Sequence, residues 1–239
     1  MNPTAAHNFQ KLAWDSDHFG LKIGRAASSG EDTPQRAVEW ALATRLDCLY
    51  LLADAHDAAT LRSAADAGFR LVDIRVTLSA DIPRAEPQAG IRIADPSDLP
   101  FLSRLAARSH QNSRFYADGR FPMERCDALF AAWIERSCTD PNFAGVVFVA
   151  DAGGEPVAYI TCTISQGVGG IGLVAVDESH RGRGLGGALL KQAHAWFRAQ
   201  GASRAQVVTQ GANTKALRMY ERAGFNVETV QLWFHWWRP

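Results

Sequence analysis

The sequence lacks several features that would assign it at once to a broad class. No apolar run approaches 18 residues, so no membrane-spanning helix is predicted. The first residues, Met1–His7, are polar and contain no apolar core of a secretion signal. Lys and Arg together number 25, as do Asp and Glu, so the formal net charge is zero. This balance disfavours both a nucleic-acid-binding protein and an acidic disordered chain.

Cysteine is scarce as well. The four cysteines form neither a CxxC pair nor a cluster with zinc-ligand spacing; they are Cys48, Cys126, Cys138 and Cys162. The sequence therefore predicts no metal site and a reduced, cytoplasmic protein that binds neither nucleic acid nor membrane.

The 239 residues are 47% apolar, which is enough for one or two packed domains. A segment rich in proline, glycine and charge, Ala80–Gly90, predicts a boundary between residues 1–85 and 90–239. The first part has the order strand, helix, strand, helix, strand, which is typical of a small α/β unit. Its clearest predicted elements are a helix from Pro34, a strand at Cys48–Ala53, a helix at Ala58–Ala67 and a strand at Leu71–Leu78.

The second part begins with predicted strands and helices and ends with alternating helices and strands. Gly153 and Gly154 predict a hairpin turn between the first two of three successive strands. The predicted elements are Ile91–Ala94, Met123–Ser137, Val146–Ala150, Pro156–Ile164, Ile171–Val176, Leu185–Gln200, Val207–Thr209, Asn213–Ala223 and Val230–Trp237. This order predicts an α/β (α+β) fold.

The most informative segment is Ile171–Gly187, with the sequence IGLVAVDESHRGRGLGG. An apolar strand leads into a basic, glycine-dense turn, and a long helix follows directly. Glycine lets the backbone approach an anion closely, and the start of a helix offers unpaired N–H groups. The segment therefore predicts a site for a pyrophosphate. Its glycine spacing fits neither a P-loop nor a dinucleotide-binding loop.

The run Arg181-Gly182-Arg183-Gly184-Leu185-Gly186 resembles the R/Q-x-x-G-x-G/A signature of the GNAT N-acetyltransferase superfamily. With the preceding strand and the downstream NTKALRMYERAGF, the resemblance extends over residues 91–239. It implies a mixed, mostly antiparallel central sheet flanked by helices, here preceded by a smaller α/β domain. It also implies that acetyl-CoA is the co-substrate.

The resemblance implies roles for two backbone segments and one side chain. The pyrophosphate would lie on the N–H groups of Arg181, Gly182, Arg183, Gly184, Leu185, Gly186 and Gly187. The pantetheine arm would pair like an extra strand with Leu173, Val174, Ala175 and Val176, and Asn213 would hydrogen-bond it.

On the helix from Asn213, residues at spacings of four and three share a face, so Asn213 and Tyr220 would reach one groove. GNAT enzymes often use a tyrosine at this position as general acid, and Tyr220 is the first catalytic candidate. A base would help to deprotonate the attacking amine. Asp73 is the predicted base and Glu178 the alternative, whereas His180 and His194 are expected at the surface.

A narrower resemblance, to dTDP-fucosamine acetyltransferases, rests on WDSDHFG, SRFYADGRF and the tail QLWFHWW. That family acetylates the 4-amino group of a dTDP-4-amino-4,6-dideoxyhexose and has a smaller N-terminal domain, which would contribute to the substrate cleft. Arg114 or Arg120 would bind the substrate pyrophosphate, and Phe115 or Tyr116 would stack on its base. The tail tryptophans Trp233, Trp236 and Trp237 would shape a sugar pocket, the core or a homodimer interface.

Two other functions fit the same motifs. In the first, the chain would be an acetyltransferase whose acceptor is a peptide, a protein N-terminus or another small amine such as an antibiotic. In the second, the chain would be a non-catalytic module that binds acyl-CoA, although the presence of both Asn213 and Tyr220 disfavours this function. The sugar stereochemistry, the acetylated nitrogen, the acyl-chain length and the base remain open.

Overall fold

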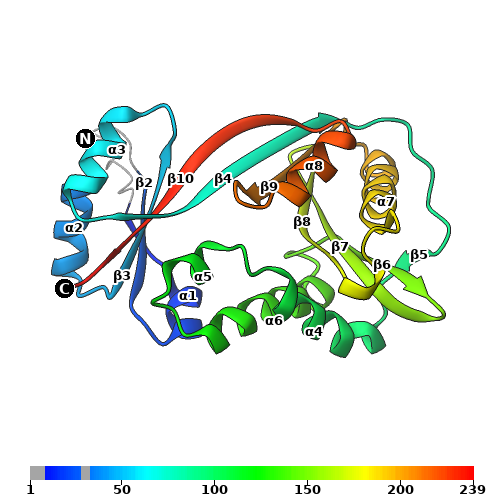
Figure 1. Ribbon diagram of the computed structural model, residues 1–239, viewed down its shortest axis with the longest axis horizontal. Helices are drawn as coiled ribbons and strands as arrows, with labels where there is room; N and C mark the ends of the chain where they lie inside the picture. Colours follow the sequence, from blue (N-terminus) through cyan, green and yellow to red (C-terminus); the bar gives the residue numbers. More distant parts are fainter. Residues whose placement is uncertain (1–8, 28–32) are drawn as a thin grey trace, which may run out of the picture. The chain divides into compact units, whose positions relative to one another are not determined.

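The computed structural model describes residues 9–27 and 33–239 (Figure 1). The prediction for Met1–His7 lies outside these residues. The chain forms two compact units. The first comprises residues 1–75, 113–125 and 230–239, and the second comprises residues 76–112 and 126–229.

These units differ from a single division between residues 85 and 90. Their boundaries fall inside two long strands, β4 (Arg70–Asp81) and β10 (Asn226–Trp237), each of which begins in one unit and ends in the other. The first unit also includes α5 (Arg114–Asp118), which lies far along the chain from its other helices. The predicted linker begins within β4, because this strand continues to Asp81.

In the first unit, four strands follow the order β1-β2-β3-β10. The first three are β1 (Phe9–Lys11), β2 (Ile23–Ala27) and β3 (Cys48–Asp54). Strands β2 and β3 are parallel, whereas β10 pairs antiparallel with β3 from Gln231 opposite Asp54 to Trp237 opposite Cys48. The other helices are α1 (Ala13–Phe19), α2 (Pro34–Ala43) and α3 (Ala58–Asp66).

Local chemistry explains where these helices begin. Helix α2 begins at Pro34, as predicted, and the side chain of Thr33 accepts a hydrogen bond from the backbone N–H of Arg36. Asp57 caps α3 in the same way through the N–H of Thr60. Buried alanines on α2 and α3 pack against Leu49, Leu51 and Trp236. Close approach of these helices to the sheet therefore depends on small side chains.

The second unit contains a sheet with the order β4-β9-β8-β7-β6-β5. Its strands are β5 (Ile91–Ile93), β6 (Val146–Ala152), β7 (Glu155–Ser165), β8 (Val168–Val176) and β9 (Arg204–Gln210). Strands β5 to β8 are antiparallel, and β8 and β9 are parallel. The predicted mixed, mostly antiparallel sheet flanked by helices is therefore confirmed.

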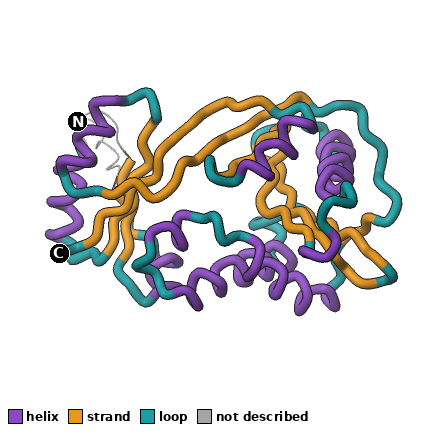
Figure 2. Tube along the Cα trace, in the orientation of Figure 1, coloured by secondary structure: helices purple, strands orange, loops and turns teal. Residues whose placement is uncertain are grey.

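The helices of the second unit are α4 (Leu99–Ser109), α6 (Met123–Thr139), α7 (Leu185–Ala199) and α8 (Thr214–Arg222) (Figure 2). Helix α7 buries Leu189, Leu190 and Phe197 in the core. Each such side chain contributes about 1.5–3 kcal/mol to stability when it is fully buried. A Cβ on Gly169 of β8 would lie 2.5 Å from the Phe197 ring, so only glycine allows this contact.

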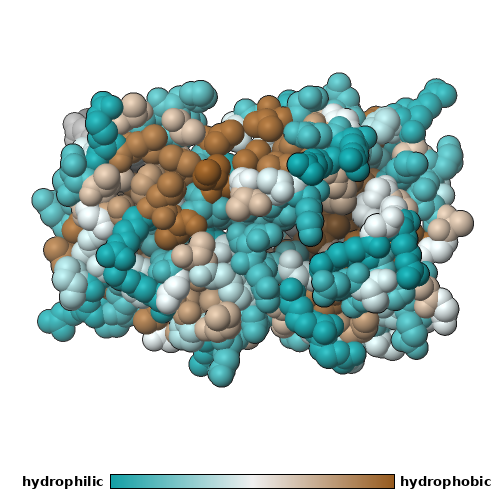
Figure 3. Space-filling model, in the orientation of Figure 1, coloured by the Kyte–Doolittle hydropathy of each residue, from teal (hydrophilic) through white to brown (hydrophobic). Residues whose placement is uncertain are grey.

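The face of the molecule shown in Figure 3 mixes hydrophilic and hydrophobic patches, as is usual for a folded protein. Within residues 9–27 and 33–239, no helix is both long and apolar enough to cross a membrane.

Candidate active site

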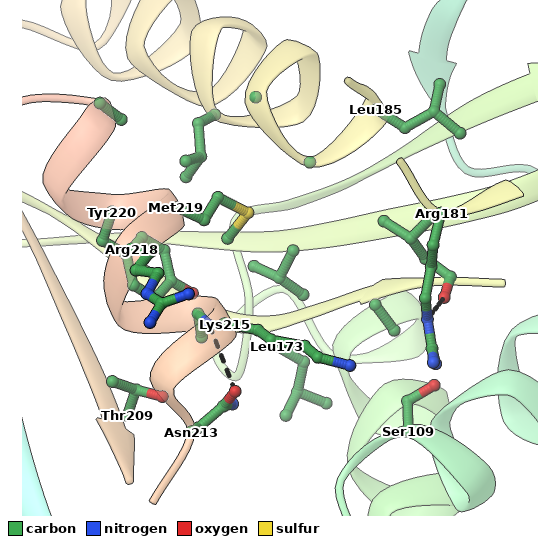
Figure 4. Close-up of a pocket in the computed structure, with 18 of the residues that line it drawn as sticks. Ser109, Leu173, Arg181, Leu185, Thr209, Asn213, Lys215, Arg218, Met219 and Tyr220 are labelled. Atoms are coloured by element: carbon green, nitrogen blue, oxygen red, sulfur yellow. Dashed lines mark hydrogen bonds between the residues drawn. The ribbon is translucent and has the colours of Figure 1, made fainter. Parts of the chain in front are cut away.

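A pocket of about 1220 Å³ lies within the second unit. Its walls come from β8, β9, α7, α8, the C-terminal end of α4 and the middle of α6 (Figure 4). Five basic side chains line it, and no acidic side chain is among its described lining residues. The basic residues are Arg181, Lys191, Lys215, Arg218 and Arg222. This charge favours a polyanionic ligand.

The pocket opens where two parallel strands separate. Strands β8 and β9 pair only from Val168 opposite Arg204 to Ile171 opposite Val207. Beyond this point, residues 172–176 of β8 and 208–210 of β9 line the pocket. The predicted pantetheine segment, residues 173–176, therefore lies on an unpaired strand edge, to which an extended ligand can add.

A side chain on β7 contacts β8 close to the point where β8 and β9 separate. The register of β7 and β8 shifts between Ile160 and Cys162. At this irregularity, the N–H of Leu173 donates to Oγ1 of Thr161 at 2.8 Å. A Cβ on Gly172 would lie 2.6 Å from the same oxygen. Glycine at position 172 therefore lets the Thr161 hydroxyl replace a missing ladder bond.

The glycine-dense loop presents a row of free donors. Gly182 and Gly184 both have φ of 79°, a conformation that favours glycine. Gly184 precedes the first turn of α7, and no side chain caps this end of the helix. In the described part of the chain, none of the N–H groups of residues 182–187 donates to a protein acceptor. An anion at this end of α7 would satisfy them.

The remaining loop contacts hold this end of α7 in place. A Cβ on Gly186 would lie 2.6 Å from Sδ of Met219 on α8, so glycine allows the two helices to approach closely. Nε of Arg181 donates to the carbonyl of Val176 at 3.1 Å. Arg183 donates to the carbonyl of Ser179 at 3.3 Å.

Asn213 and Tyr220 both line the pocket, and Figure 4 shows them at the start of α8 and further along it. Asn213 is the N-cap of α8, and its Oδ1 accepts from the N–H of Ala216 at 3.2 Å. Its Nδ2 group remains available to donate to a ligand. Tyr220 is 4% exposed, and burial raises the pKa of its phenol. The phenol is therefore a hydrogen-bond donor at neutral pH.

Asp73 lies on β4 in the first unit. Burial raises the pKa of its carboxyl group to about 6, and Arg114 opposes this rise. Glu178, the alternative base, is outside the set of pocket-lining residues, and its side chain is 90% exposed.

Arg114 is enclosed by aromatic rings of the first unit. Its guanidinium carbon lies 4.7, 4.4 and 4.2 Å from the ring centroids of Tyr50, Phe115 and Trp233. Burial lowers its pKa, and its Nε is buried without a hydrogen-bond partner in the described residues. The structure thus gathers Asp73 and Arg114 in one electrostatic cluster.

The predicted substrate-binding residues Arg114, Phe115 and Tyr116 form the start of the short helix α5. Phe115 is 3% exposed and packs against Phe19 and Phe121. Its faces are therefore occupied within the first unit, whereas Tyr116 is half-buried. Arg120 is exposed beside Trp237.

Of the two histidines expected at the surface, one lies in the core. His194 on α7 is 2% exposed and stacks on Phe225, because its position faces the core. His180 is partly exposed and contacts Ser179 and Asp177. Ser109 and His110, at the end of α4, also line the pocket and were not predicted from the sequence. A single histidine at a helix end has no spacing that would indicate this.

Comparisons with known proteins agree with this geometry. The profile described as "Acetyltransferase (GNAT) family" matches residues 106–225. The dTDP-fucosamine acetyltransferase of Escherichia coli is 26% identical over 95% of this chain and 97% of its own length. The spore coat polysaccharide biosynthesis protein SpsD of Bacillus subtilis is 26% identical over 60% of this chain and 49% of its own.

A solved structure has the same fold. It is a GCN5-related N-acetyltransferase from Sphaerobacter thermophilus, with a TM-score of 0.64 and 20% identity. The likeness covers 91% of this chain and 74% of that protein.

Proposed function

Because the chain belongs to the acetyltransferase (GNAT) family, we propose that it acetylates the amino group of a dTDP-4-amino-4,6-dideoxyhexose with acetyl-CoA. The observation that carries this proposal is the similarity to a dTDP-fucosamine acetyltransferase over nearly the whole of both chains. A relative named for spore coat polysaccharide supports the same substrate class. The enzyme would work in the cytoplasm, in the synthesis of a surface polysaccharide.

The residues present fit acetyl-CoA, which supplies the acetyl group as a thioester. The free N–H groups of residues 182–187 would hold its pyrophosphate, with Arg181 and Arg183 beside them. The edge of β8 at residues 173–176 would pair with the pantetheine arm, and Nδ2 of Asn213 would donate to it. The basic lining matches the charge of the phosphates.

Tyr220 would stabilise the leaving thiolate. A free thiol has a pKa near 8.5 and a phenol near 10, so full proton transfer is uphill by about 2 kcal/mol. Burial raises the pKa of Tyr220 further, which makes full transfer harder still. We therefore assign Tyr220 as a general acid that acts first as a hydrogen-bond donor, with the proton transferred late.

The first unit would contribute to acceptor recognition. Arg114, buried among three rings, would face the phosphates of the nucleotide, with Tyr116 nearby. Asp73 is the base predicted from the sequence, and a pKa of about 6 suits proton transfer at neutral pH. These assignments stay predictions, as does a homodimer.

A turnover assay tests the proposed substrate. Release of free thiol is measured with dTDP-4-amino-4,6-dideoxygalactose, its gluco epimer, a set of simple amines and a panel of peptides. We expect turnover with one epimer and none with peptides. Turnover with peptides or simple amines alone would assign another acceptor. Tight acetyl-CoA binding without turnover on any amine would indicate a binding module.

A further inference from the structure

His110 stands at the C-terminal end of α4, in the second unit, and lines the pocket. Its ring stacks on Phe130, with centroids 4.7 Å apart and an interplanar angle of 23°. Its Nε2 lies 3.0 Å from Oη of Tyr159. The imidazole is therefore held by one ring contact and one hydrogen bond, from two different elements.

Tyr159 places the imidazole beside the strand that would hold the thioester arm. It is fully buried on β7 and lies opposite Ala175 of β8 in the antiparallel ladder. Ala175 belongs to the stretch of β8 that pairs with β7 but not with β9 and that lines the pocket. His110 is thus held on the wall of the pocket near this stretch.

The second ring nitrogen of His110 is available. Among the described residues, Nδ1 makes no hydrogen bond, and it is absent from the buried polar atoms that lack a partner. Nδ1 is therefore not fully buried, and it belongs to a residue that lines the pocket. If Nε2–H donates to Tyr159 Oη, Nδ1 carries the lone pair and can accept a proton.

The surroundings keep His110 neutral. Burial alone lowers the pKa of the imidazole to about 4, and no charged side chain contributes. The ring is therefore uncharged at neutral pH, and when Nε2–H donates to Tyr159, the lone pair of Nδ1 is free to take a proton. A weak base still assists, because the attacking nitrogen becomes strongly acidic as it bonds to the carbonyl carbon.

The other proton acceptors of the pocket are less suitable. No carboxylate is among the described lining residues. His194 is buried against Phe225, and His180 already contacts Asp177 and Ser179.

We propose that His110, and not the sequence-predicted Asp73, is the catalytic residue that takes the proton from the acceptor amine, and that Tyr159 positions it. This inference rests on the proposed acetyl transfer but not on the identity of the sugar. The amine nitrogen bonds to the carbonyl carbon, the C–S bond breaks, and the electron pair goes to sulfur. The amine loses one proton to Nδ1 of His110, and the sulfur gains one from Tyr220. Solvent then restores both side chains.

The test compares His110→Gln and His110→Ala with His56→Gln, a substitution at an exposed histidine of the first unit. The acceptor is whichever amine the native protein acetylates. General base catalysis is worth about 10²–10⁴-fold, so we expect kcat to fall by that range in both His110 variants. Affinity for CoA should stay within about twofold in all three variants, which shows that the pocket is intact. Added imidazole should restore part of the His110→Ala activity.

The variant Tyr159→Phe tests whether Tyr159 positions the His110 imidazole or only stabilises the fold. We expect kcat to fall about tenfold, with unchanged affinity for CoA and unchanged KM for the acceptor. Because Tyr159 would act only through His110, Tyr159→Phe should change nothing further in a His110→Ala background.

Each contrary result has one meaning. Native kcat in both His110 variants would overturn the proposal. A second contrary result is a loss of His110→Ala activity that imidazole does not restore, together with an equal loss of activity in Asp73→Asn. Loss of CoA affinity would assign His110 a structural role and overturn the proposal as well. If the native protein acetylates no amine, the proposed function fails first, which the turnover assay shows separately.

Discussion

At the scale of single residues, the proposed chemistry depends on the protonation states of two side chains of the pocket at neutral pH. Tyr220 is protonated at neutral pH, as any phenol with a pKa near 10 is, and burial raises its pKa further. His110 stays neutral because burial lowers its pKa. A donor and an acceptor thus line one pocket without a charged partner. This arrangement suits a reaction in which one proton leaves nitrogen and another reaches sulfur.

For Tyr220→Phe, we expect kcat to fall by about 10²–10³-fold, the usual loss when one donor to a developing anion is removed. Affinity for acetyl-CoA should not change, because the ring remains in the core. Thiol release and calorimetric titration with CoA measure the two quantities. Unchanged turnover would remove Tyr220 from the mechanism.

Asp73→Asn should stabilise the protein at neutral pH. The folded state raises the carboxyl pKa from 3.8 to about 6, so between these values the folded state binds more protons than the unfolded state. Stability is therefore lost as pH rises through this window. After a discount for the partial exposure of Asp73, we expect a gain on the order of 1 kcal/mol at pH 7 and none below about pH 4.

Urea unfolding at several pH values measures this effect. Asp81→Asn, at the exposed end of the same strand, is the control. A gain that persists at low pH would show that the burial of charge is not its cause.

At the scale of elements, the two ends of α7 have the same backbone conformation but different surroundings. Gly184 and Gly201 have φ of 79° and 80°, and a Cβ on either would meet no atom within 4 Å. Alanine at either position should cost about 1–2 kcal/mol of stability through backbone strain. Only Gly184 lies in the pocket, so Gly184→Ala alone should weaken CoA binding, by about tenfold or more.

Thermal unfolding and calorimetric titration of the two variants provide the comparison. Equal loss of CoA affinity in both variants would mean that the loop acts only through the stability of the helix.

A hydroxyl group of β7 holds β8 close to the point where β8 and β9 separate. Thr161→Val would leave the N–H of Leu173 without its acceptor, at a cost of about 1–3 kcal/mol. Thr163→Val, two residues along, removes only a 3.5 Å hydrogen bond to Gly170 and should cost less. Denaturant unfolding measures both costs. We also expect weaker CoA binding in Thr161→Val alone, and similar results for the two variants would contradict this account of the separated strands.

At the scale of the whole molecule, local signals predicted the elements well. Pro34, Gly201 and Gly224 mark helix ends through backbone conformation alone, and the predicted hairpin at Gly153 and Gly154 is confirmed by positive φ at both. The glycine-dense loop was likewise readable because its residues are consecutive.

Contacts between distant residues were not predictable in the same way. Residues 113–125 and 230–239 join the first unit because Phe121 packs against Phe19 and Trp237. His110 and Tyr159 meet across 49 residues of sequence. Sequence periodicity does not indicate which distant residues come into contact. The part of the pocket around His110 could therefore be identified only from the three-dimensional structure.

Following a labelled acetyl group tests most directly whether the protein transfers acetyl from acetyl-CoA to a nucleotide sugar. The protein is incubated with acetyl-CoA carrying ¹³C in the acetyl carbonyl and with dTDP-4-amino-4,6-dideoxygalactose or its gluco epimer, and the products are followed by NMR. We expect the label to become an amide on the amino nitrogen of one nucleotide sugar, with equimolar CoA released. Label that remains on CoA, or that appears only as free acetate, would contradict this expectation.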